Sequence, residues 1–136
     1  MPDTAPARTP VSARDLVLAL VADVAVVLLF AAVGLASHND GEVSSWGVTM
    51  VALPFLVGLA IAWLVTLAWR APLAAVRTGL PVWAITLVLG LVGRFLLGEG
   101  IALPFVIVAT LTLLVLLVGW RLLAGSLRRA RERRAS

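Results

Sequence analysis

The chain has 136 residues, of which 62% are hydrophobic and 13% are charged. Soluble domains are about half hydrophobic and about a quarter charged, and so small a core could not hide this much apolar surface from water. The composition therefore excludes a soluble globular domain and predicts a protein embedded in a lipid bilayer. The absence of cysteine also excludes disulfides, thiolate metal sites and cysteine nucleophiles.

The first 13 residues are polar and rich in proline without an apolar period, which is typical of a disordered arm. Four apolar segments follow, each close to the roughly 20 residues that a helix needs to cross the hydrocarbon core. They predict an all-α domain over 14–123 with four transmembrane helices, followed by a basic tail over 124–136. The expected helices cover 16–36, 46–69, 80–97 and 101–123.

Ten of the eleven basic residues, all of them arginines, lie on one side of these helices, and the loops 37–45 and 98–100 contain none. Short loops rich in arginine stay in the cytoplasm, so both termini are expected there. This distribution accounts for the net charge of +4 without nucleic-acid binding. Six arginines that follow the fourth segment are expected to contact anionic lipid headgroups: Arg121, Arg128, Arg129, Arg131, Arg133 and Arg134.

A short word recurs in the second and fourth segments. Val51-Ala52-Leu53-Pro54-Phe55 resembles Ile101-Ala102-Leu103-Pro104-Phe105, and Trp69-Arg70 resembles Trp120-Arg121. Both segments are expected to run in the same direction, so a parallel duplication of a helical hairpin would explain the match. Chance repetition in a biased composition explains it equally well. The link Gly98-Glu99-Gly100 is so short that the third and fourth helices must be antiparallel neighbours.

Asp23 in the first segment and Arg94 in the third are ionisable residues inside the expected membrane region. Such residues are costly there and usually face the interior of a bundle. Small neighbours allow another helix to approach closely, and both residues have them: Ala19 and Ala22 beside Asp23, and Gly90 and Gly93 beside Arg94. We therefore expect Asp23 and Arg94 to point inward and to pair. The pair could fix helix register or couple transport, although Arg94 could instead reach Glu99 or the headgroups.

His38 and Glu99 are expected as polar groups on the outer face. The alternation of His38, Asp40 and Glu42 matches no established metal-site spacing. The chain also lacks the nucleotide-binding, metalloprotease and hydrolase motifs. We therefore expect no catalytic residue, no metal and no cofactor.

With these residues placed, the chain resembles a family of small bacterial and archaeal membrane proteins known as domain of unknown function 3054. The resemblance spans Asp15 to Arg121 and implies a four-helix integral membrane protein of the prokaryotic plasma membrane, with no established activity. It rests on Asp15 and Asp23, Gly34, Ser37-His38, Pro54-Phe55-Leu56, Trp69-Arg70, Thr78-Gly79, Trp83, Gly90 with Arg94, and Gly119-Trp120-Arg121.

Two classes of function remain. The first is a structural or accessory membrane protein that packs against a membrane-protein partner or a second copy of itself. The second is a small oligomeric transporter or permeation unit that uses Asp23 and Arg94. One buried acid and one arginine make a sparse substrate site, so the sequence favours the first class.

Overall fold

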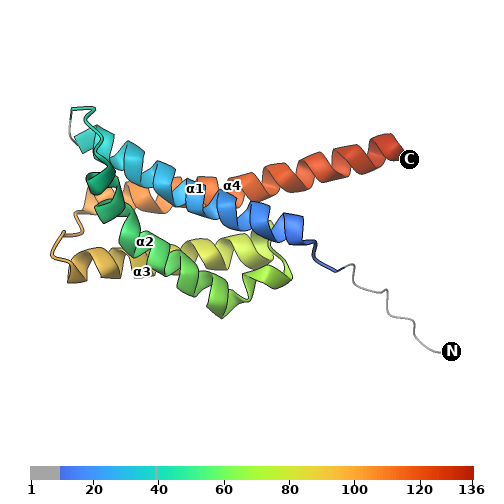
Figure 1. Ribbon diagram of the computed structural model, residues 1–136, viewed down its shortest axis with the longest axis horizontal. Coiled ribbons are helices and arrows are strands. Elements are labelled where there is room, and N and C mark those ends of the chain that lie inside the picture. Colours follow the sequence, from blue (N-terminus) through green and yellow to red (C-terminus); the bar gives the residue numbers. More distant parts are fainter. Residues whose placement is uncertain (1–9, 39) are drawn as a thin grey trace.

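The computed structural model describes residues 10–38 and 40–136, and its regular structure within these ranges is entirely helical (Figure 1). Its long helices are α1 (Ala13–His38), α2 (Ser45–Thr66), α3 (Leu80–Leu96) and α4 (Leu103–Ala135). Four helical segments are long and apolar enough to cross a membrane. The prediction of an all-α protein with four membrane-spanning helices is confirmed. Most of the expected arm, residues 1–9, lies outside the described residues.

The helices form an up-and-down bundle with two distinct ends (Figure 1). The start of α1, the connection between α2 and α3 and the C-terminal part of α4 lie at one end, which we call the terminal end. The loops that join α1 to α2 and α3 to α4 lie at the opposite end, which we call the loop end. The last turns of α4 project beyond the bundle, because the expected basic tail continues α4 as one helix to Ala135. Arginine, alanine and glutamate are all good helix formers.

The connection between α2 and α3 begins earlier in the chain than the sequence indicated, because α2 ends three residues sooner than expected. α2 ends at Thr66, because Leu67 adopts a left-handed conformation with φ of 53°. A 3₁₀ turn, η1 (Ala68–Arg70), and a π-helical turn, η2 (Ala75–Gly79), then lead into α3. The hydroxyl of Thr78 donates a hydrogen bond of 2.6 Å to the carbonyl of Ala71, which folds the connection onto itself. This fold brings the backbone of the connection against α4.

α2 and α3 make the closest helix pair, because glycines remove side chains from their contact. A Cβ atom added at Gly90 would lie 2.2 Å from the ring of Phe55, and one at Gly93 would lie 2.7 Å from Pro54. Both glycines of α3 thus face α2. On α1, Ala19 is fully buried in the bundle and Ala22 is half-buried.

Three phenyl rings from three helices meet inside the bundle. Phe30 of α1 and Phe55 of α2 pack edge to face with ring centroids 5.1 Å apart. Phe105 of α4 lies 6.1 Å from Phe30 and 6.3 Å from Phe55. We call these residues the phenylalanine cluster. Arrangements of this kind are favoured because the edge of one ring carries positive charge and the face of the next carries negative charge.

The two halves of the chain are not equivalent in structure. Pro54 lies inside α2, whereas Pro104 lies in the first turn of α4. Trp69 lies in a 3₁₀ turn and is exposed, whereas Trp120 lies inside a continuous helix. α2 also packs far more extensively on α3 than α4 packs on α1. The repeated words therefore occur in different local structures, and duplication stays a hypothesis.

Candidate functional site

The carboxylate of Asp23 lies inside the bundle, and its side chain is inaccessible to solvent. Its Oδ1 accepts hydrogen bonds from Nη1 of Arg121 at 2.8 Å and from Nε1 of Trp120 at 2.9 Å. Its Oδ2 accepts from Nη2 of Arg121 at 2.6 Å and from Nε1 of Trp63 at 2.9 Å. A carboxylate has about four acceptor positions. All of them are therefore used.

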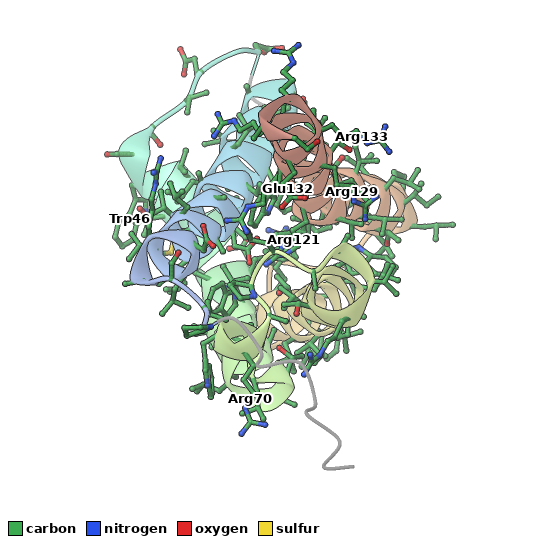
Figure 2. The ribbon with its side chains drawn as sticks, turned by 90° about the vertical axis from the view of Figure 1, so that its right-hand side faces the viewer. Trp46, Arg70, Arg121, Arg129, Glu132 and Arg133 are labelled. Carbon is green, nitrogen blue, oxygen red and sulfur yellow. The ribbon has the colours of Figure 1, made fainter. Side chains whose placement is uncertain are left out.

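Arg121 is buried to the same degree, with 1% of its surface exposed. Besides its two bonds to Asp23, Nε donates to the carbonyl of Pro72 at 2.9 Å and Nη1 donates to the carbonyl of Leu117 at 2.8 Å. A guanidinium has five N–H groups in a planar fork, and the two-pronged contact with a carboxylate is its strongest pairing geometry. Figure 2 shows Arg121 at the centre of the bundle, between the helices.

Three helices and the connection before α3 contribute to this group, which we call the Asp23 cluster (Asp23, Trp63, Trp120 and Arg121). α1 supplies the acid, α2 supplies Trp63, and α4 supplies Trp120 and Arg121. The connection before α3 supplies the carbonyl of Pro72, and a Cβ atom at Gly79 would lie 3.1 Å from Cδ of Arg121. Glycine at position 79 thus leaves room for the arginine stem. The cluster joins four parts of the fold.

Two expectations from the sequence are corrected here. The partner of Asp23 is Arg121 and not Arg94, because Arg121 lies at the same end of the bundle as Asp23 whereas Arg94 lies in the last turn of α3 at the loop end. Arg121 also does not contact lipid headgroups, since its guanidinium is enclosed by α1, α4 and Pro72. The distance between the ends prevents the pairing of Asp23 with Arg94.

The side chain of Arg94 occupies a separate place at the loop end. Its guanidinium carbon lies 4.3 Å from the ring centroid of Phe105, which is a cation–π contact. The described residues form two ion pairs, Asp23–Arg121 and Asp15–Arg128, so Arg94 has no carboxylate partner among them. Its Nε is buried and has no hydrogen-bond partner within the same residues.

Arg94 lines a cavity of about 340 Å³ that also contains the two polar residues predicted at the outer face. The structure brings Arg94, His38 and Glu99 together around this space. Its remaining walls are mainly apolar, and two members of the phenylalanine cluster, Phe30 and Phe105, belong to them. We call this space the Arg94 cavity.

An apolar layer separates the Arg94 cavity from the Asp23 cluster. Val27 of α1, Phe55 and Leu59 of α2, and Leu113 of α4 are 2% exposed or less, and Phe30 is 3% exposed. These residues lie along the helices between the two polar sites. Protein interiors of this kind are packed without room for water. On α1, α2 and α4 apolar side chains thus separate the two polar sites. On α3 the same level holds the buried hydroxyl of Thr86, which has no hydrogen-bond partner among the described residues.

The remaining arginines in the C-terminal part of α4 lie on its outer surface. Arg128 forms an ion pair with Asp15 in the first turn of α1, which joins the two helices that carry the chain termini. Figure 2 shows Arg129 and Arg133 pointing away from the bundle. The exposed arginines of this segment are Arg128, Arg129, Arg131, Arg133 and Arg134.

Sequence reasoning missed the role of two tryptophans. Trp63 and Trp120 both donate their indole N–H to Asp23. A signal was present, because Trp63 lies deeper than the other tryptophans and a buried indole N–H normally finds an acceptor. Asp23 is the acid at that depth.

The described residues contain no group of three His, Cys, Asp or Glu side chains that could hold a metal ion. The model of the family described as "Protein of unknown function (DUF3054)" matches residues 20–124. No curated protein and no solved structure matches the chain.

Proposed function

The chain belongs to the DUF3054 family, and we propose that it is a structural or accessory component of the prokaryotic plasma membrane, with both termini in the cytoplasm. In this role its bundle presents a fixed apolar surface to lipid and to a membrane-protein partner or a second copy of itself. The basic C-terminal helix would contact anionic lipids at the cytoplasmic surface.

The observation that carries this proposal is the saturation of Asp23. A group that couples transport to proton or substrate movement must exchange its partners during the cycle. Asp23 has four hydrogen-bond donors around it and no exposed surface. A buried ion pair with every position filled is better suited to fixing the arrangement of helices than to exchanging ligands.

The apolar layer between the two polar sites supports the same conclusion. A permeation unit needs a polar path or a set of sites that a substrate can occupy in turn. In this bundle Val27, Phe55 and Leu113, each fully buried, lie between the Arg94 cavity and the Asp23 cluster. A substrate in the cavity would meet closely packed apolar side chains before it reached Asp23.

The basic helix supports the orientation and the lipid contact. Five exposed arginines lie on the part of α4 that projects from the terminal end. Each arginine near an anionic leaflet contributes roughly 1 kcal/mol of attraction, and cytoplasmic loops carry an excess of arginine.

A flux assay in proteoliposomes tests the proposal. We expect the purified chain to give no proton, cation or organic-cation flux above that of empty liposomes. Asp23→Asn should lower thermal stability, and Thr112→Ser, a conservative change away from the cluster, should not. Flux in the wild-type chain that Asp23→Asn abolishes without loss of stability would reject the structural role.

Topology is tested separately, because the chain has no cysteine of its own. Single cysteines replace Asp40 in the loop between α1 and α2 and Ser126 in the C-terminal part of α4. An impermeant thiol reagent added to intact cells should label only the first. Labelling of the second would place the termini outside and contradict the proposed orientation.

The alternative function, a small oligomeric permeation unit, is favoured by one observation. The Arg94 cavity holds about 340 Å³ and opens at the loop end, as an entrance to a substrate path would. In that case Arg94 would attract an anion, and a rearrangement of the phenylalanine cluster would have to open the path. Anion flux that Arg94→Gln removes would select this alternative.

A further inference from the structure

A second, apolar cavity adjoins the Arg94 cavity. It holds about 270 Å³ and lies between α1 and α4. Phe30, Gly34, His38 and Phe105 line both spaces, so the two lie side by side and share these residues as walls. We call the second space the α1–α4 groove. It runs along α1 from His38 to Phe30, eight residues apart, or about 12 Å along a helix axis.

The α1–α4 groove opens sideways toward lipid. Its walls include Val33 of α1 and Val108 of α4, whose side chains are 55% and 56% exposed. In a bilayer these positions would face acyl chains. The groove exists because α1 and α4 pack lightly on each other.

Gly34 makes the junction of the two spaces possible. A Cβ atom at this position would meet no other atom within 4 Å. The glycine therefore faces empty space and is not required for a helix contact, unlike Gly90, which lies against Phe55. A larger side chain at position 34 would enter the cavities without displacing the protein.

We propose that the Arg94 cavity and the α1–α4 groove together bind one phospholipid of the leaflet at the loop end. Its phosphate binds the guanidinium of Arg94, and one of its acyl chains lies in the groove. This inference goes beyond the proposed function, since it assigns a ligand to a site that the structural role does not use.

The charges favour a phosphate as the ligand of Arg94. Its guanidinium lies over the ring of Phe105, its Nε is unpartnered among the described residues, and it forms no ion pair with them. Guanidinium groups bind phosphate oxygens in pairs, and basic pockets between transmembrane helices bind lipid headgroups. His38 can add a donor from the same cavity.

Glu99 is the one acid that lines the Arg94 cavity. Its carboxylate repels a phosphate and attracts a headgroup donor such as a hydroxyl or an ammonium. Glu99→Gln should therefore tighten the binding of a phospholipid that has no such donor. The direction of this change in affinity follows from the location of the Glu99 carboxylate in the cavity.

Native mass spectrometry of the delipidated full chain tests the proposal, with dioleoyl phosphatidylglycerol as the probe and oleate as a second arm. The wild-type chain should retain one phospholipid more than Arg94→Gln does, with affinity at this site falling about tenfold in the variant. Gly34→Leu should also lose that lipid. Gly119→Leu is the matched control, because Gly119 is helical, has no atom within 4 Å of an added Cβ and lines neither cavity.

The exposed arginines in the C-terminal part of α4 are present in every variant. Lipid bound to them therefore contributes equally to each measurement and does not affect the difference between variants. Thermal melting in detergent confirms that each variant is folded, and Gly34→Leu keeps the test valid if Arg94→Gln is unstable. Equal lipid retention by the wild-type chain, Arg94→Gln and Gly34→Leu would overturn the proposal. Retention of oleate in place of the phospholipid, with the same dependence on Arg94, would overturn the choice of ligand.

Discussion

Removal of either charge from the Asp23–Arg121 pair should destabilise the protein strongly, and removal of both should cost less than the sum. Asp23→Leu leaves the guanidinium of Arg121 buried without a carboxylate. Arg121→Met leaves the carboxylate buried with only its two indole donors, from Trp63 and Trp120.

Each single variant should lose about 3–5 kcal/mol, which is the usual cost of stranding one member of a buried ion pair. The double variant strands no charge, although it leaves two indole N–H groups without acceptors. We therefore expect it to be more stable than the sum of the single losses implies, by about 2–3 kcal/mol.

Unfolding of the purified chain in mixed micelles, followed by tryptophan fluorescence, measures these free energies. The pair Asp23→Leu and Arg94→Met is the control cycle, and its losses should add, because the two side chains lie at opposite ends of the bundle. Additive losses for Asp23 and Arg121, or coupling between Asp23 and Arg94, would refute the reasoning.

Three further variants probe single contacts. Trp63→Phe removes one hydrogen bond to a buried carboxylate and should cost about 1.5–3 kcal/mol in the same unfolding assay; no loss would show that the indole does not support Asp23. Gly90→Ala should destabilise by about 1–3 kcal/mol because its Cβ would meet the ring of Phe55, whereas Gly119→Ala should be neutral or stabilise by up to about 1 kcal/mol; equal effects would contradict the close approach of α2 and α3. Arg128→Ala breaks a partly exposed ion pair and should change thermal stability by less than about 1 kcal/mol, with a difference that disappears at high salt.

The apolar segments were sufficient to predict the helices, because a bilayer leaves few alternatives to a spanning helix. Helix ends were less predictable. Trp69 and Arg70 continue the apolar pattern of α2, but Leu67 leaves the helical conformation before them. That change depends on the fold of the following connection, which no local pattern encodes.

The inward position of Asp23 could be predicted, and its partner could have been. Asp23 lies ten residues after the start of α1, and Arg121 lies fourteen residues before the end of the antiparallel helix α4, whose last turns project beyond the bundle, so their depths agree. The arginine was assigned to the headgroups because five further arginines follow it along the chain. The depth of an arginine along its helix axis predicts the partner of Asp23 better than its position in a run of charged residues does.

The Arg94 cavity and the α1–α4 groove could not be predicted from the sequence. They depend on how closely α1 and α4 pack in the folded bundle, which no local pattern in the sequence encodes. Gly34 enters the sequence argument only as one of the residues that carry the family resemblance. The open space beside Gly34 can be recognised only from the positions of the neighbouring helices in the folded structure.

Solid-state NMR in lipid bilayers tests the central claim most directly, since it reports contact between a labelled Asp carboxylate carbon and an Arg guanidinium nitrogen. Besides the partly exposed Asp15–Arg128 contact, which every variant keeps, the account predicts one buried contact, consistent with N–O distances of 2.6 and 2.8 Å. This buried contact disappears in Asp23→Asn and in Arg121→Lys and remains in Arg94→Lys. A contact that survives Arg121→Lys and disappears in Arg94→Lys would contradict it.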